Sequence, residues 1–141
     1  MIIDEDLLYT KEHEWIRINE EDNTATIGIS DYAQEALGDI TFVELPSVNS
    51  EVEQFEQFAA IESVKAANDI FSPMSGKIIE VNETLESKPA LINKSCYDRG
   101  WIAKIDISAM EETSNLMTAD EYRSFLESAE ASSGSDASSD E

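Results

Sequence analysis

Lys65 is the most distinctive reactive group in the sequence, because it is the only cation between Arg17 and Lys77 in a stretch with twelve acidic residues. The small residues Ala66 and Ala67 follow it and leave its ammonium group accessible to another protein. A lysine that forms a Schiff base needs burial or a nearby cation to lower its pKa, whereas surrounding acids raise it. Two interpretations remain: a solubilising surface lysine, or a lysine displayed for covalent modification.

The other reactive side chains give little support for self-contained enzymatic chemistry. His13 is the only histidine, it lies between Glu12 and Glu14, and no nucleophile elbow accompanies it. One histidine and the single Cys96 cannot build a His/Cys zinc site. The five glycines are too widely spaced for a phosphate-binding loop. We therefore interpret His13 as a structural imidazole and expect neither a catalytic residue nor a bound metal.

The charge of the chain excludes several classes of partner. The 141 residues include 31 acidic and 9 basic side chains, which gives a formal net charge of −22. This charge opposes binding to nucleic acid and to anionic membranes. The longest apolar run, Phe58–Ile61, is far shorter than the roughly 20 residues that span a bilayer. With no secretory signal and one cysteine, we expect a soluble intracellular protein.

Alternating apolar and polar residues predict a chain rich in short β-strands. The spacing matches strands that are half buried, and turn residues separate one segment from the next. Many short strands at close spacing imply an antiparallel sandwich or barrel. The expected strands are 16–18, 25–29, 40–45, 57–63, 69–71, 77–81 and 101–107.

Two helices are expected at positions marked by capping residues. The first is Asp31–Leu37, between Ser30 as N-cap and Gly38, and the second is 119–126, which follows Thr118 as N-cap. The last fifteen residues contain no basic, aromatic or branched apolar side chain, so they cannot offset the entropy of ordering. We therefore expect a folded domain over residues 1–128 and a disordered acidic tail over residues 129–141.

Several segments of the chain, in the same order, resemble the H proteins of the glycine cleavage system. The similarity covers residues 7–128, and its segments are 9–15, 28–39, 42–46, 62–66, 72–77 and 100–101. One departure is the stretch 54–58, where a turn that often contains glycine is expected before the lipoyl-bearing strand. The acidic tail is a second departure.

The resemblance implies a lipoyl carrier rather than an enzyme. Its fold would be mainly β, a barrel-sandwich hybrid of two small antiparallel sheets with short peripheral helices and a C-terminal helix. Lys65 would carry lipoate in amide linkage on an exposed hairpin, and the recognition residues around it would be Glu62, Ser63, Val64 and Ala66. The family's loaded arm folds back into a cleft of the carrier. The matching positions that would receive its cationic amine are Glu14 and Asp69.

The same resemblance implies a set of partners. The carrier would take an aminomethyl group from the glycine decarboxylase, pass it to the aminomethyltransferase, and deliver electrons to dihydrolipoamide dehydrogenase. A lipoate ligase or an octanoyltransferase would modify it, and the carrier would be a monomer. The expected compartment is the bacterial cytoplasm, or the mitochondrial matrix for a mature eukaryotic form.

Four other functions compete with glycine cleavage. An H-like protein that donates lipoate to other enzymes would share the same sequence features. A biotin carrier is disfavoured because Val64 and Ala66 stand where methionines usually flank the biotinyl lysine. The lipoyl domains of 2-oxo-acid dehydrogenases normally belong to long multidomain chains. An unmodified acidic interaction module would lack any mass added to Lys65.

Overall fold

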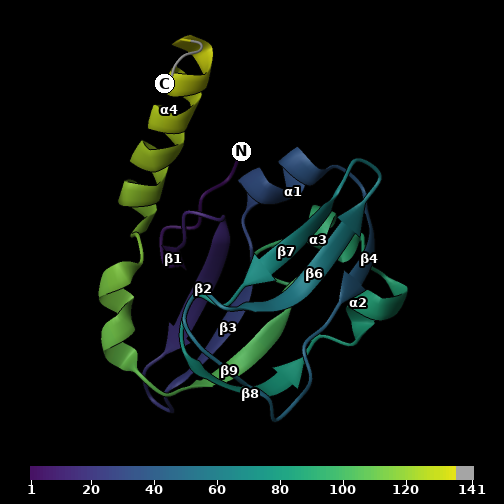
Figure 1. Cartoon of the computed structure of the whole chain (residues 1–141), viewed down its shortest axis with the longest axis vertical. Helices are drawn as coiled ribbons and strands as arrows, with labels where there is room; N and C mark the ends of the chain where they lie inside the picture. The colour runs from purple at the N-terminus through teal and green to yellow at the C-terminus, as the bar shows by residue number, and fades with distance from the viewer. Residues whose placement is uncertain (136–141) are drawn as a thin grey trace.

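Two antiparallel β-sheets, with short helices around them and a longer C-terminal helix, make up the protein (Figure 1). The structure is a computed structural model that describes residues 1–135, with side chains described for residues 1–129. The expected fold class is confirmed: the chain is mainly β, and its sheets do not close into a barrel.

The larger sheet has six strands in the order β1-β2-β3-β9-β8-β5. Its alternating isoleucines lie opposite one another, because Ile16 pairs with Ile27 and Ile78 with Ile105. All four are buried in one apolar cluster, which confirms the alternation expected from the sequence. The strands are β1 Leu8–Tyr9, β2 Glu14–Asn19, β3 Thr24–Ile29, β9 Ala103–Ile107, β8 Gly76–Val81 and β5 Glu51–Val52.

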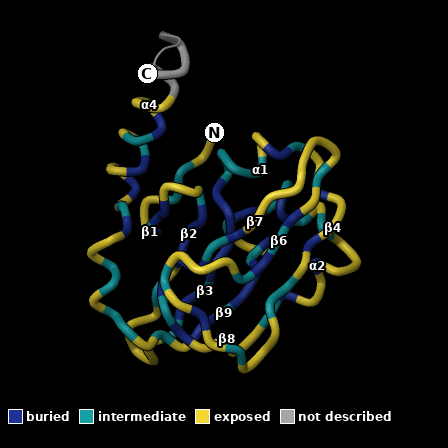
Figure 2. Tube along the Cα trace, in the orientation of Figure 1, coloured by how far each residue is buried: buried dark blue, intermediate teal, exposed yellow. Residues whose placement is uncertain are grey.

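The smaller sheet has three strands in the order β4-β6-β7. They are β4 Ile40–Glu44, β6 Gln57–Ser63 and β7 Ala67–Phe71. Ile61 of β6 and Ile70 of β7 are buried with Ala103 of β9, so the core lies between the two sheets. The turn between β6 and β7 lies at the edge of the molecule, and Figure 2 shows it as exposed. Below the turn, Ile61 of β6 and Ile70 of β7 are buried, whereas residues 67–69 of β7 are exposed.

Helix α1, Asp31–Leu37, has the expected bounds and caps. The Ser30 hydroxyl accepts a hydrogen bond from the backbone N–H of Ala33, and the Gly38 N–H donates to the carbonyl of Gln34. Three further helices have no counterpart among the elements expected from the sequence: α2 Thr84–Ser87, α3 Leu91–Lys94 and the 3₁₀ helix η1 Met110–Asn115. No helix in the described part of the chain has the length and apolar character to cross a membrane.

Helix α4, Ala119–Ser135, begins with the expected capping box. The Thr118 N–H donates to the Glu121 carboxylate, and the Glu121 N–H donates to the Thr118 hydroxyl. The predicted end at residue 126 is wrong, because the helix continues through residues 129–135 of the expected disordered tail. No glycine or proline occurs in the helix before Gly134, and Ala129 and Ala131 favour helix. Residues 136–141 of that tail lie outside the described residues.

Candidate functional site

Lys65 lies in the exposed turn of the β6–β7 hairpin. The Ser63 hydroxyl oxygen accepts hydrogen bonds from the backbone N–H groups of Lys65 and Ala66, each at 3.2 Å. The Ser63 N–H donates to the Ala66 carbonyl at 2.8 Å and closes the turn. Among the described side chains, Lys104 and Arg123 are the only cations that form ion pairs. No ion pair therefore holds the Lys65 amine.

The other expected recognition residues surround this amine. Glu62, Val64 and Ala66 are exposed, and Val64 retains 68% of its surface. The Val64 N–H donates to the Asp39 carbonyl at 3.0 Å, which ties the turn to the segment that follows helix α1. The turn therefore has a defined backbone and an accessible surface.

Gly38, expected from the sequence only as the end of a helix, is also a neighbour of Lys65. A Cβ atom at this position would lie 3.2 Å from Cε and 3.5 Å from Cδ of Lys65. Gly38 also has φ +77°, which side-chain-bearing residues rarely adopt. Glycine therefore both permits this backbone and makes room for the lysine stem.

Glu14 is buried where strand β2 meets strand β7. One carboxylate oxygen accepts a short hydrogen bond from the Thr10 hydroxyl, and the other accepts from the Phe71 N–H at 3.0 Å. Burial raises the pKa of Glu14 to about 7, although both hydrogen bonds act in the opposite direction. The charge of this carboxyl group therefore changes near neutral pH.

Asp69 lies on the same strand as Phe71 but is exposed. Its carboxylate accepts a hydrogen bond from the Gln57 side chain at 3.3 Å. Since side chains two residues apart share one side of a strand, Asp69 and Phe71 face the same way. The structure thus links Glu14 to strand β7 and places Asp69 two residues before the contact.

A cavity of about 640 Å³ lies next to the residues that hold the Glu14 carboxylate, although Glu14 itself is not among its lining residues. Thr10 and Phe71, which bind the two carboxylate oxygens of Glu14, both line it. Its other lining residues are Tyr9, Lys11, Glu12, Phe55, Asn115 and Met117. Sequence reasoning could not identify this cavity, because its walls come from four separate parts of the chain.

His13 has a structural position, as expected. Its Nδ1 lies 2.8 Å from the Tyr122 hydroxyl, which also lies 2.7 Å from the Ser30 hydroxyl. The imidazole packs against the Tyr32 ring, and burial lowers the pKa of His13. His13 and Ser30 thereby hold helix α4 against the sheet. The described residues contain no group of three or more His, Cys, Asp or Glu placed to bind a metal.

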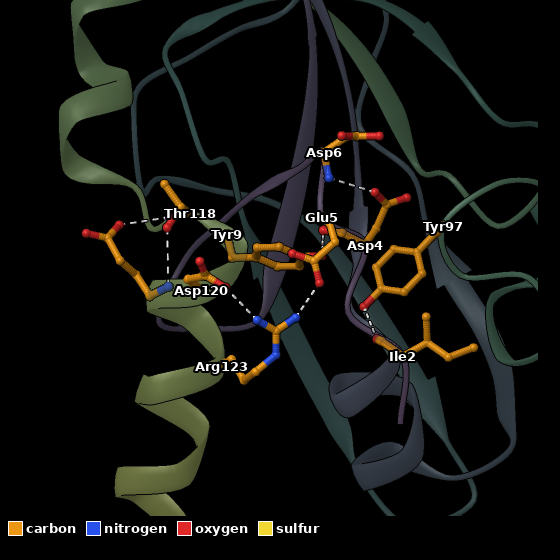
Figure 3. Close-up of polar contacts among 10 residues, drawn as sticks. Ile2, Asp4, Glu5, Asp6, Tyr9, Tyr97, Thr118, Asp120 and Arg123 are labelled. Atoms are coloured by element: carbon orange, nitrogen blue, oxygen red, sulfur yellow. Dashed lines mark hydrogen bonds and ion pairs between the residues drawn. The ribbon is translucent and has the colours of Figure 1, made fainter.

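Polar contacts fix the N-terminal segment to helix α4 and to the side chains of Tyr9 and Tyr97 (Figure 3). Arg123 of helix α4 pairs with Glu5 and with Asp120. The Tyr9 hydroxyl donates to the Asp4 carbonyl at 2.8 Å, and the Tyr97 hydroxyl donates to the Ile2 carbonyl at 2.7 Å. These contacts hold strand β1, which leads into the wall of the cavity.

Comparisons with known proteins agree with this architecture. Residues 7–129 match the model of the glycine cleavage H-protein family. A glycine cleavage system H protein of Vibrio campbellii is 52% identical over 125 residues, which are 89% of this chain and 98% of the relative. A mitochondrial H protein of Drosophila melanogaster is 49% identical over 120 residues, or 85% of this chain and 72% of the relative.

A solved structure gives the same result at the level of the fold. The crystal structure of a glycine cleavage system H protein from Mycobacterium marinum superposes with a TM-score of 0.82 at 37% identity. The match covers 89% of this chain and 99% of that one. The chain therefore belongs to the glycine cleavage H-protein family.

Proposed function

We propose that this protein is the lipoyl carrier of glycine cleavage and that Lys65 bears lipoate in amide linkage. The observation that supports this most directly is the display of a free primary amine on a hydrogen-bonded turn. A lipoate ligase or octanoyltransferase must bring an activated acyl group to that amine inside its own active site. The exposed Glu62, Val64 and Ala66 are then the surface that such an enzyme recognises, and Ser63 shapes the turn.

The surroundings of Lys65 fit a lipoyl group. About a dozen bonds separate the lysine Cα from the nearer lipoyl sulfur, and at about 1.2 Å per bond they span about 14 Å. Strand β7 advances about 13 Å from Ala67 to Phe71, at about 3.3 Å per residue. The segment from Lys65 to Ala67 adds up to about 7 Å to this path, so a chain of that length on Lys65 covers most of the distance along β7 toward the cavity. Phe55, Phe71 and Met117 give the cavity the apolar lining that an alkyl and disulfide group requires.

Two carboxylates near the cavity, Glu14 and Asp69, suit a cationic cargo. When bound, the dithiolane supplies an acceptor for the aminomethyl group and, as a dithiol, a carrier of two electrons. We assign to Glu14 the role of accepting hydrogen bonds from the amine of that group, because the two residues holding its carboxylate line the cavity. Asp69 adds a second negative charge on the same strand.

The partners follow from the family. The carrier would serve the glycine decarboxylase, the aminomethyltransferase and dihydrolipoamide dehydrogenase in turn, as a monomer without a catalytic residue of its own. Relatives occur in bacteria and in a fly mitochondrion. We accordingly propose the bacterial cytoplasm as its compartment, with the mitochondrial matrix as the alternative.

A lipoate donor for other enzymes is the alternative function, and the cavity argues against it. Such a donor needs only an accessible lysine. A carrier of a cationic cargo would use both the cavity and the buried carboxyl group near it, whereas a simple lipoate relay requires neither. Glycine decarboxylation supported by the purified carrier separates the two functions.

The substitution Lys65→Arg tests the proposal. Arginine keeps the charge and most of the stem but cannot be acylated, because the guanidinium stays protonated. The variant should fold with a stability within about 0.5 kcal/mol of the wild type, as expected for an exposed site. It should gain no lipoyl mass from a competent ligase and support no glycine decarboxylation.

Lys77→Arg is the matched control, since Lys77 is an exposed lysine on strand β8. This variant should be lipoylated and active. A lipoyl adduct mapped to another lysine, or full turnover with Lys65→Arg, would refute the assignment.

A further inference from the structure

Phe55 has a backbone conformation that is unusual for an aromatic residue. Its φ is +67°, in the left-handed region where a bulky side chain is strained. The surrounding chain enforces this conformation. The Phe55 N–H donates to the Ser72 carbonyl at 2.7 Å, and the Ser72 N–H donates to the Glu56 carbonyl at 2.8 Å. Glycine would satisfy the same turn without strain.

Burial of the Phe55 side chain in the core does not offset this backbone strain. Half of its surface (50%) is exposed, and the ring belongs to none of the three buried apolar clusters. A strained residue that is held in place by its neighbours but contributes little to the core is typical of a functional site. The stability of the fold therefore does not explain an aromatic ring at this position, whereas a functional role would.

The ring forms one wall of the cavity beside Glu14. Phe71 and Met117 form other apolar parts of the wall, and Thr10 and Glu12 line its polar part. Strand β7 connects this cavity directly to the Lys65 turn, because Phe71 ends the strand that begins after Ala66 (Figure 1). A group attached to Lys65 and extended along β7 would thus meet the Phe55 ring.

We propose that the Phe55 ring covers the sulfur-bearing end of the lipoyl arm in this cavity, positions it beside Glu14 and limits the access of water. The inference rests on the proposed function, because it requires a lipoyl arm on Lys65. The chemistry is suitable, since sulfur makes favourable contacts with aromatic rings. Phe55 is a positioning residue in this scheme. The turn itself could be formed by glycine, so the strained φ of +67° is explained by the need for an aromatic ring at this place.

The experiment uses the lipoylated full-length protein, loaded by the glycine decarboxylase from glycine labelled with carbon-13 at its methylene carbon, with the carboxyl carbon released as CO2. The variants are Phe55→Gly, which removes the ring and accepts the backbone, and Phe55→Tyr, which keeps an aromatic ring. Phe42→Leu is the control, because Phe42 is similarly exposed (52%) and does not line the cavity. Two quantities are measured: the carbon-13 chemical shift of the methylene group, and the lifetime of the loaded protein. Hydrolysis consumes one water, releases formaldehyde and ammonium, and leaves the sulfur as a thiol.

The ring current of the aromatic side chain at position 55 should displace the carbon-13 chemical shift of the methylene group. This displacement should occur in wild type, Phe55→Tyr and Phe42→Leu, and it should be absent from Phe55→Gly. The lifetime should fall about fivefold in Phe55→Gly, which corresponds to about 1 kcal/mol of lost contact. Phe55→Gly should remain folded in thermal melts, because glycine adopts φ +67° freely.

Each remaining outcome has one meaning. If Phe55→Gly matches wild type in shift and lifetime, or if Phe55→Tyr fails to restore them, the role of Phe55 is refuted and the carrier function stands. If the wild-type protein gains no lipoyl group on Lys65, or is lipoylated but never loaded, the proposed function itself is refuted.

Discussion

Glu14 shows how the environment of one residue sets its chemistry. The carboxyl group is 1% exposed and accepts two hydrogen bonds, yet burial raises its pKa to about 7. A cation that enters the adjoining cavity would favour the charged form and lower this pKa. Glu14 can therefore be neutral in an empty cavity and charged beside a bound amine.

The raised pKa of Glu14 predicts a specific dependence of stability on pH. Between pH 4.5 and about 7 the folded protein holds a proton on Glu14 that the unfolded chain has released. The free energy of unfolding should therefore fall as pH rises through this range, by on the order of 3 kcal/mol from this group. Urea unfolding of wild type and Glu14→Gln at several pH values isolates the effect. Parallel curves for the two proteins would contradict it.

Glu14 and Asp69, near the cavity, should stabilise the loaded arm without affecting lipoylation. Charge-assisted hydrogen bonds to a cationic amine contribute about 1.5–3 kcal/mol when shielded from water. Glu14→Gln should therefore shorten the lifetime of the loaded arm, and Asp69→Asn should do so less, because Asp69 is exposed. Intact mass should show complete lipoylation of both variants. Equal lifetimes in wild type, both single variants and the double variant would mean that these acids are ordinary surface or structural groups.

At the scale of the elements, Tyr122 connects helix α4 to the sheet. Its hydroxyl interacts with His13 and with Ser30, and its ring stacks on Tyr9 with centroids 4.3 Å apart. Tyr122→Phe keeps the stacking but removes the partner of the His13 Nδ1 and one of the two partners of the buried Ser30 hydroxyl. The free energy of unfolding should decrease by about 2 kcal/mol, as measured by urea unfolding. A change below about 0.5 kcal/mol would match an ordinary surface position and contradict this role.

The end of helix α4 should be dispensable, although its backbone is helical to Ser135. The last buried side chain of this helix within the described residues is Leu126, and residues 127–129 are exposed. Deletion of residues 129–141 removes no described core contact, so the melting temperature and aminomethyl loading should stay nearly unchanged. A large decrease in either quantity would show that the segment binds the body, and the boundary at residue 128 would have to be revised.

At the scale of the whole molecule, the net charge of −22 should influence how the carrier meets its partners. Long-range attraction to basic surfaces raises association rates, and salt screens it over about 8 Å at physiological ionic strength. The association rate with the glycine decarboxylase should therefore fall as salt increases, as stopped-flow or biosensor measurements would show. A rate independent of salt would rule out electrostatic steering.

Local spacing in the sequence was sufficient to predict much of the architecture. The strand Gln57–Ser63 and the helix Asp31–Leu37 have the predicted bounds. Period-two alternation and capping chemistry act between residues close in the chain, so they can be read without a structure. The end of α4 was wrong, because a stretch without apolar side chains can still form helix where nothing interrupts it.

The properties of the site depend on contacts between residues distant in the chain. The sequence contains a carboxylate at Glu14, but its burial depends on the approach of Thr10 and of the end of strand β7 to the start of strand β2. Gly38 lies beneath the Lys65 stem because helix α1 ends beside a hairpin that begins twenty residues later. Phe55 lines the same cavity as Thr10 and Met117. Desolvation and enclosure arise from all the atoms around a group, and a linear pattern does not specify which distant atoms those are.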